Sequence, residues 1–227
     1  MKNKLIGFVV SMEKEAKLIL DTAQIKEKFN IANKDIYLGE FFDYNFVMII
    51  AGIGKVNSAL STQLLLDKFS PELIINFGVA GGKQGSNLTA GDIVQVEKVC
   101  QYDFDLSELD DVNIGYMQDF DLTYFPVKTI QSLENIYPPV TATTGDRFTA
   151  QKYFLDIMKN LKAQIVDMEC GAIAQVCYTN NIELMIVKLI SDVDGNDNSI
   201  YSQYANNVKS VCEKIPTAIK TILENLE

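Results

Sequence analysis

The sequence predicts an α/β fold in which residues 1–227 form a single three-layer domain, with a central twisted mixed β-sheet flanked by helices. Apolar runs of strand length alternate with segments whose apolar residues recur at helical spacing. Near-continuous apolar strands of this kind are typical of a mostly parallel sheet that is covered on both faces. Two early runs lie close together in the chain, and a hairpin there would add antiparallel pairing.

In the first 80 residues, apolar runs of strand length alternate with segments whose apolar residues recur at helical spacing. Apolar residues such as Ala16 and Ile19 form a helical stripe just after the first apolar run. Asp43-Tyr44-Asn45 divides the two runs of the expected hairpin, and Ser70-Pro71 ends the second helix. The expected strands are 5–10, 36–42, 45–51 and 73–79, and the expected helices are 13–21 and 54–69.

The rest of the chain continues this alternation after a glycine cluster that starts at Gly78. An acidic loop at 103–121 is the longest irregular segment, and we expect it to be mobile. The expected strands are 92–102, 140–144, 163–166 and 184–190, and the expected helices are 127–136, 150–161, 169–179 and 206–226.

The composition removes several classes of function. The chain has no histidine, which excludes Ser-His-Asp triads, Cys-His pairs and HExxH zinc sites, so acid/base chemistry falls to carboxylates. The four cysteines lack CxxC spacing, which favours small apolar residues in a reduced, cytoplasmic protein over a metal site. A net charge of −10 argues against nucleic acid and anionic membranes as partners. The apolar runs are too short to span a bilayer, and the N-terminal segment lacks a signal-peptide cleavage pattern.

Carboxylates follow three of the expected strands, at the edge of the sheet where ligands gather in α/β proteins. Glu15 lies one turn into the first helix, Glu169 lies at a helix start, and Asp192 follows the run 184–190. Each acid by itself is equally well explained as a residue that stabilises a helix N-terminus. Together they predict glycosidic-bond chemistry, in which carboxylates protonate a leaving group, activate water and stabilise an oxocarbenium-like centre.

Two glycine-rich turns do not fit the common nucleotide-binding patterns. The segment from Gly78 to Lys83 has three residues between its outer glycines, and Gln84 replaces the Ser or Thr of a P-loop. Gly52-Ile53-Gly54 lacks the third glycine of a dinucleotide fingerprint. Both turns fit a tight turn or the close approach of a sugar or base, and we expect no cofactor.

Six segments then occur in order along nearly the whole chain: Ser11-Met12-Glu13-Lys14-Glu15, Ala51-Gly52-Ile53-Gly54-Lys55-Val56, Asn76-Phe77-Gly78-Val79-Ala80-Gly81-Gly82, Thr144-Gly145-Asp146-Arg147-Phe148, Val166-Asp167-Met168-Glu169 and Ile190-Ser191-Asp192. In this order they resemble the motifs of the 5′-methylthioadenosine/S-adenosylhomocysteine nucleosidases, which belong to the purine nucleoside phosphorylase superfamily. The resemblance implies that fold, and hydrolysis of the N-glycosidic bond of adenosine-type thionucleosides by water.

The resemblance also implies a role for each acid. Glu15 would activate the attacking water, Glu169 would bind the ribose hydroxyls through its two acceptor oxygens, and Asp192 would protonate purine N7. Phe148 would stack on adenine beside the Thr149 main chain. The other implied substrate contacts are Met12, Ile53, Val79, Met168, Lys188, Ser191 and Tyr201, with Leu106 and Leu109 entering from the partner subunit of a homodimer.

The chain departs from the family pattern at Lys188, where arginine is frequent, at Val79, where serine occurs, at Asp167, where glutamate is usual, and at Tyr102, where histidine is common. The changes around the attacking water keep a second class open, a nucleoside-binding sensor that has lost turnover. A nucleoside phosphorylase is the other alternative, but it needs a cationic pocket for phosphate, which Glu15 would repel. The apolar contacts fit methylthio, homocysteinyl, deoxy and futalosine-like 5′ substituents alike.

Overall fold

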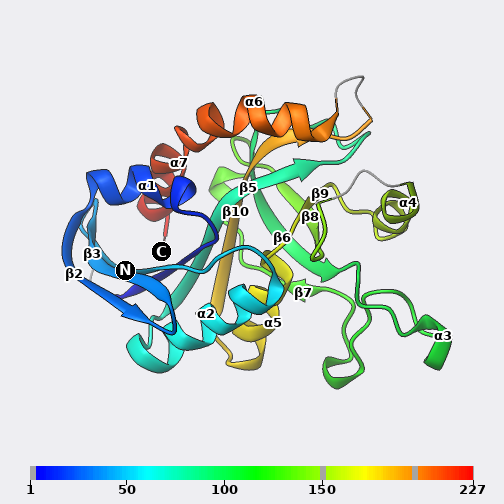
Figure 1. Cartoon of the computed structure of the whole chain (residues 1–227), viewed down its shortest axis with the longest axis horizontal. Helices are drawn as coiled ribbons and strands as arrows, with labels where there is room; N and C mark the ends of the chain where they lie inside the picture. The colour runs from blue at the N-terminus through cyan, green and yellow to red at the C-terminus, as the bar shows by residue number, and fades with distance from the viewer. Residues whose placement is uncertain (1–3, 149–151, 196–198, 227) are drawn as a thin grey trace.

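The computed structural model describes residues 4–148, 152–195 and 199–226, and it has helices packed against a mixed β-sheet (Figure 1). The strands are β1 (Ile6–Val10), β2 (Gln24–Ile31), β3 (Lys34–Phe41), β4 (Tyr44–Ile50), β5 (Leu73–Gly82), β6 (Ile93–Gln101), β7 (Phe125–Pro126), β8 (Pro139–Thr144), β9 (Ile165–Asp167) and β10 (Glu183–Val193). The α-helices are α1 (Glu13–Thr22), α2 (Lys55–Phe69), α3 (Ser107–Asp110), α4 (Lys152–Asn160), α5 (Cys170–Thr179), α6 (Ile200–Cys212) and α7 (Ile215–Glu224), and the 3-10 helices are η1 (Gln118–Phe120) and η2 (Gln131–Leu133).

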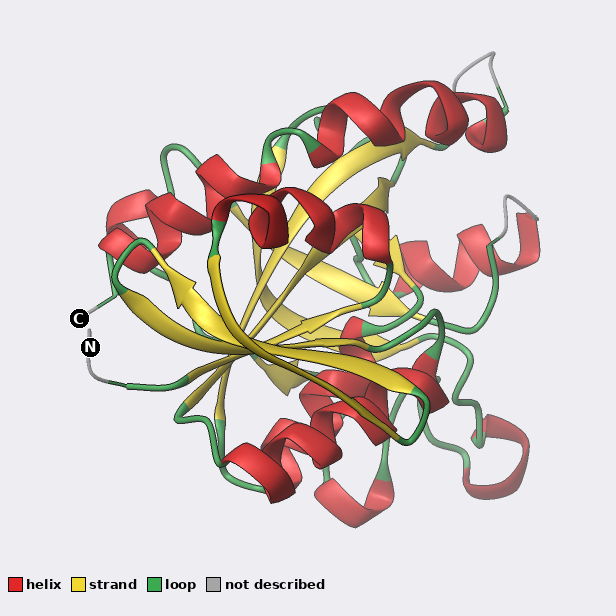
Figure 2. Ribbon diagram, turned by 60° about the vertical axis from the view of Figure 1, so that its left-hand side comes forward, coloured by secondary structure: helices red, strands yellow, loops and turns green. Residues whose placement is uncertain are grey.

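The strand order of the sheet is β10-β6-β8-β9-β5-β1-β4-β3-β2, with β7 paired to β6. Since β10 also pairs with β5 in parallel, the strands β5, β9, β8, β6 and β10 close into a ring. The strands β1, β4, β3 and β2 continue from β5 as an open, twisted sheet (Figure 2). The pairing of β1 with β4 and β5 is parallel, whereas β2, β3 and β4 pair in antiparallel fashion. The predicted mixed sheet is therefore confirmed.

Helices cover both faces of the sheet, with α1, α6 and α7 on one side and α2 and α5 on the other (Figure 1). The first strand shows why its residues form a continuous apolar run. Phe8 packs in one core with Ile19 and Ile219, and the next residue, Val9, packs in the opposite core with Leu65. Alternate side chains thus enter different cores, and both need to be apolar. In the described part of the chain, none of the helices is long and apolar enough to cross a membrane.

Two expectations for local structure are wrong. The helix expected at 127–136 is mostly irregular and contains the 3-10 turn η2. The buried side chain of Gln95 accepts a hydrogen bond from the Ile130 main-chain N–H (2.8 Å) and donates to the carbonyl oxygens of Ile130 (3.2 Å) and Tyr137 (3.0 Å). These bonds satisfy main-chain groups that an α-helix would have paired internally. The helix expected at 206–226 is two helices, because Pro216 starts a new helix at its first turn.

The hairpin lies where it was expected, but its turn is one residue earlier. Phe42 and Asp43 have positive φ angles of 48° and 65°, which fits a two-residue turn that matches the twist of the flanking strands. The edge strand β2 was not predicted, and neither was the short strand β7. The acidic loop at 103–121 contains α3 and η1, and α3 projects away from the sheet (Figure 1).

Candidate active site

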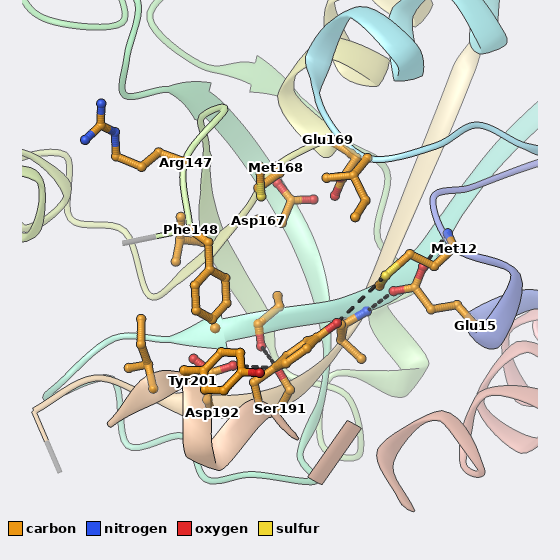
Figure 3. A pocket seen from close by; sticks show the side chains of 17 residues that line it. Met12, Glu15, Arg147, Phe148, Asp167, Met168, Glu169, Ser191, Asp192 and Tyr201 are labelled. Atoms are coloured by element: carbon orange, nitrogen blue, oxygen red, sulfur yellow. Dashed lines mark hydrogen bonds between the residues drawn. The ribbon is translucent and has the colours of Figure 1, made fainter. Parts of the chain in front are cut away.

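A cavity of about 380 Å³ opens near the carboxyl ends of β1, β5, β9 and β10 (Figure 3). It lies at the edge of the sheet where the sequence predicts a ligand site. Most of the predicted site residues line it: Met12, Glu15, Ile53, Val79, Phe148, Met168, Glu169, Ser191, Asp192 and Tyr201. The cavity thus brings together, at the predicted strand ends, side chains that lie far apart in the sequence.

The remaining predicted site residues are not part of the described wall. Lys188 is buried behind it and contacts Asp167. Leu106 and Leu109 lie in the projecting acidic loop, where Leu109 is 79% exposed. Thr149 lies outside the residues that the structure describes.

Several residues of the wall were not predicted as site residues: Ala80, Gly81, Arg147, Val166, Asp167, Ile200 and Tyr204. Tyr204 lies three residues after Tyr201 in α6 and therefore on the same helix face, but the sequence placed the start of this helix after both. Tyr204 packs against Phe148 with ring centroids 5.8 Å apart. Its hydroxyl accepts a hydrogen bond from Lys14 Nζ at 2.7 Å.

Glu15 is held by main-chain donors at the N-terminus of α1. Its Oε1 accepts a hydrogen bond from the Val79 N–H (2.8 Å), and its Oε2 accepts one from the Met12 N–H (3.0 Å). The bond to the Met12 N–H also caps the N-terminus of α1. Glu15 therefore stabilises a helix N-terminus, as one interpretation of the sequence held, whatever its role in catalysis. Burial raises the pKa of Glu15, while these hydrogen bonds and the charge of Lys188 oppose the increase.

Gly78 makes room for this carboxylate. A Cβ atom at this position would lie 2.5 Å from Glu15 Oε1. The sequence suggested the close approach of a sugar or base at this glycine cluster, and at Gly78 it is the Glu15 carboxylate that approaches the strand.

A buried ion pair supports the opposite wall. Lys188 Nζ lies 2.8 Å from Asp167 Oδ2, and both side chains are 2% exposed. Asp167 also accepts hydrogen bonds from the Thr144 hydroxyl (2.6 Å) and the Cys170 N–H (2.9 Å). Burial is the largest single effect and favours the neutral form of Asp167, but the charge of Lys188 and the hydrogen bonds from Lys188, Thr144 and Cys170 together lower the pKa of this acid. The pair is therefore ionised.

Glu169 lies two residues further on, at the start of α5. Its Oε1 accepts a hydrogen bond from the Gly54 N–H at 3.0 Å. Burial, followed by the charge of Asp167, raises the pKa of Glu169 to about 7, although Lys188 and the Gly54 N–H work against the increase. This acid therefore titrates near neutral pH.

Asp192 lies across the cavity from Glu169 (Figure 3). Its Oδ1 accepts a hydrogen bond from the Ser191 hydroxyl at 2.6 Å. A Cβ atom at Gly81, on the neighbouring strand, would lie 3.1 Å from Asp192 Oδ2. Burial raises the pKa of Asp192, and the charge of Asp194 adds to the increase. A raised pKa favours the protonated acid.

The cavity wall is acidic and apolar. Arg147 is the one basic residue among the described residues of the wall, and its guanidinium carbon lies 4.7 Å from the centre of the Phe154 ring. Figure 3 shows this side chain pointing away from the centre of the cavity. Within the described part of the chain, no group of three or more acidic or thiol side chains is placed to hold a metal ion.

Comparison with known proteins defines the class first. The model of the phosphorylase superfamily matches residues 5–224. The chain is 34% identical over 235 residues to a 5′-methylthioadenosine/S-adenosylhomocysteine nucleosidase of Buchnera aphidicola subsp. Acyrthosiphon pisum. The alignment covers 100% of this chain and 99% of that relative. This chain belongs to the 5′-methylthioadenosine/S-adenosylhomocysteine nucleosidases within the phosphorylase superfamily.

Solved structures agree with this assignment. An S-adenosylhomocysteine nucleosidase from Streptococcus pyogenes, in complex with 5-methylthiotubericidin, is 25% identical with a TM-score of 0.87, and 99% of this chain and 98% of that chain are covered. A futalosine hydrolase of Helicobacter pylori shares the fold at 20% identity, with a TM-score of 0.89 and 98% coverage of both chains.

Proposed function

We propose that this chain hydrolyses the N-glycosidic bond of 5′-methylthioadenosine and S-adenosylhomocysteine and releases adenine, as the names of its relatives indicate. Water is the acceptor rather than phosphate. The observation that carries this proposal is the charge of the wall. It holds the carboxyl groups of Glu15, Asp167, Glu169 and Asp192, while Arg147, the one basic residue among its described residues, points away. A phosphate ion would be repelled there, whereas a glycosyl centre that gains positive charge would be stabilised.

Asp192 acts as the general acid in this mechanism. Its protonated carboxyl donates a proton to purine N7, so that adenine leaves as a neutral base when the bond to the anomeric carbon breaks. The burial that raises the pKa of Asp192 supports this role, because it keeps the proton available. The Ser191 hydroxyl fixes the carboxyl orientation through its hydrogen bond to Oδ1.

The two glutamates act on the sugar side. Glu169 accepts hydrogen bonds from the two ribose hydroxyls, and its negative charge favours the positive charge that develops at the anomeric carbon. Glu15 accepts a proton from the water that attacks this carbon. The geometry supports a fixed base, because the Val79 and Met12 N–H groups hold both oxygens of Glu15.

Val79 and Lys188 differ from the family pattern but still support Glu15. Val79 contributes its main-chain N–H, which a change of side chain leaves in place. Lys188 lies behind the wall, and its positive charge opposes the burial that raises the pKa of Glu15. We therefore favour a working hydrolase over a sensor that has lost turnover.

The remaining predicted contacts hold the substrate. Phe148 is 52% exposed at the cavity, which suits a ring that stacks on adenine. Met168 provides an apolar surface under the ribose. Met12 before α1, Ile53 before α2 and Tyr201 of α6 surround the 5′ substituent.

Incubation with 5′-methylthioadenosine, with and without phosphate, tests the proposal. We expect free adenine and free methylthioribose at the same rate in both conditions. Sugar phosphate that forms only with phosphate would identify a phosphorylase instead, and binding without product would identify a sensor. Asp192→Asn should slow adenine release about 10²- to 10⁴-fold, the usual contribution of a general acid. Turnover close to that of the parent would remove Asp192 from this role.

The functional unit in this proposal is a homodimer in the cytoplasm. Exposed apolar side chains support the dimer: Val56 and Leu60, one turn apart on α2, are 79% and 48% exposed, and Leu109 on α3 is 79% exposed. Large exposed apolar side chains of this kind are typical of an interface. The free thiols of the four cysteines fit a reducing compartment.

Light scattering tests the assembly. The parent should have twice the mass of one chain at micromolar concentration, and Leu109→Glu should shift it toward the monomer. A monomeric parent would contradict the dimer and, with it, the placement of Leu106 and Leu109 in a neighbouring site.

A further inference from the structure

We propose that the buried ion pair between Lys83 and Asp194 is a positioning device for Asp192, which holds the end of β10 against β5 and balances the charge beside the acid. The inference rests on the proposed function, in which Asp192 protonates the leaving group. Lys83 belongs to the glycine-rich segment that resembles a P-loop only loosely, and the proposed reaction gives this lysine no other role.

The geometry is that of a clamp between two strand ends. Lys83 directly follows β5 and Asp194 directly follows β10, and both side chains are 9% exposed. One oxygen of Asp194 pairs with Lys83 Nζ, and the other accepts a hydrogen bond from the Gln84 N–H. The main-chain N–H of Asp194 also donates to the carbonyl of Gly82 (3.1 Å), and the N–H of Lys83 donates to the carbonyl of Gln164 (2.9 Å).

Asp192 lies beside an irregularity of the strand ladder, at a strand end that Gln203 of α6 also holds through two hydrogen bonds with the Val193 main chain (3.1 and 3.0 Å). The pairing of β10 with β5 shifts register between Ile190 and Asp192, so Ser191 is an extra residue in the ladder. A bulge of this kind bends the strand and redirects a side chain. The contact at Asp194 comes two residues after Asp192 and fixes the strand on the far side of the bulge.

The pair also controls charge beside Asp192. Asp194 directly follows β10, two residues after Asp192, and its charge acts on the Asp192 carboxyl. Burial is the largest cause of the raised pKa of Asp192, and beyond it the Ser191 hydroxyl lowers this pKa, Asp194 raises it and Lys83 lowers it. The other charged or titratable side chains on the wall of the same cavity are Glu15, Arg147, Asp167, Glu169, Tyr201 and Tyr204.

A purely structural role would have a different signature. Buried ion pairs contribute little net stability compared with apolar replacements, although the loss of one partner is costly. A structural pair would therefore change stability in both single variants in the same direction. A pair that acts on Asp192 changes its titration in opposite directions, because the two partners have opposite charges.

The test is the carboxyl titration of Asp192 in the full-length protein, followed by NMR of ¹³C-labelled aspartate. The resonance that disappears in Asp192→Asn identifies the residue. Lys83→Met should raise the pKa of Asp192 and Asp194→Asn should lower it, each by about half a pH unit or more. Shifts of the same sign, or no shift in either variant, would overturn the electrostatic part of the proposal.

The double variant Lys83→Met/Asp194→Asn tests the positioning part. It leaves no unpaired buried charge, so it should fold even if a single variant does not. Asp192 should titrate as in the parent, but kcat for 5′-methylthioadenosine should fall about tenfold or more because the clamp is lost. Turnover equal to that of the parent would overturn the positioning role.

A matched control lies at the other end of the same strand. Glu183 is the first residue of β10, and its Oε2 lies 3.0 Å from Lys128 Nζ. Lys128→Met removes an ion pair from this strand far from the cavity, and it should change neither the titration nor kcat. If Asp192→Asn itself retains turnover, Asp192 is not the general acid, while the titration still shows whether the ion pair acts on Asp192.

Discussion

The ion pair of Lys188 and Asp167 offers a quantitative test of how the wall is held. Lys188→Met removes the cation and leaves Asp167 buried with a negative charge. At the observed separation of 2.8 Å, the pair interaction is about 6 kcal/mol at an effective dielectric constant of about 20. Loss of one partner of a buried pair costs about 3–5 kcal/mol in practice, since the remaining acid can take up a proton.

The expected result is a large loss of stability. For a chain of this size, each kcal/mol corresponds to about 2–4 °C in Tm, so Lys188→Met should lower Tm by about 6–20 °C. Urea denaturation followed by circular dichroism gives the free energy of unfolding, and a thermal melt gives Tm.

A second variant separates charge from packing. Lys188→Met/Asp167→Asn leaves no charge behind, so it should be more stable than Lys188→Met alone. The reasoning would be refuted if Lys188→Met lay within about 1 kcal/mol of the parent, or if the double variant were the less stable of the two.

Three further predictions concern the acids themselves. Glu15→Gln should lose turnover but still bind 5′-methylthioadenosine, whereas Glu169→Gln should weaken both turnover and binding. Titration calorimetry measures the binding. If Glu15→Gln fails to bind while Glu169→Gln binds normally, the two roles are assigned the wrong way round. Because the pKa of Glu169 is about 7 and its ionised form accepts the ribose hydroxyls, affinity for a non-reactive analogue should increase as pH rises through about 7. An affinity that is flat over this range would argue against a carboxylate at the diol. Gly81→Ala would place a Cβ atom 3.1 Å from Asp192 Oδ2, so kcat should fall while Tm changes little, and a parental kcat would contradict the tight fit between these strands.

The sequence predicts the ends of buried strands well, and with them most of the cavity wall. The acids Glu15, Glu169 and Asp192 could be located because each follows an apolar run of strand length, and such runs need no knowledge of long-range pairing. The ion pairs could not be located in this way. Lys188 and Asp167 lie on strands that each pair with β5 but not with each other, and only the register across β5 brings them together.

The errors in local structure also have physical causes. The edge strand β2 is exposed along most of its length, and its apolar alternation is incomplete because Glu27 stands between Ile25 and Phe29. The segment at 127–136 has an apolar pattern that fits a helix, but the side chain of Gln95, far away in sequence, bonds its main-chain groups. A contact between residues far apart in sequence overrides local preference at 127–136, whereas β2 is held by its neighbour in sequence, β3.

A site without histidine must distinguish acid from base among carboxylates alone, and hydrogen-bond donors make the difference here. Two main-chain N–H groups and the nearby Lys188 favour the ionised form of Glu15. Asp192 receives a hydroxyl hydrogen bond, and the charge of Asp194 beside it favours the proton. Burial raises the pKa of both acids. At Glu15 the two N–H groups and the charges of Lys188 and Lys14 all oppose the increase, whereas at Asp192 the Ser191 hydroxyl and Lys83 oppose it and Asp194 adds to it. In the proposed mechanism, the surroundings therefore make Glu15 the base and Asp192 the acid, although both are buried carboxylates at the ends of strands.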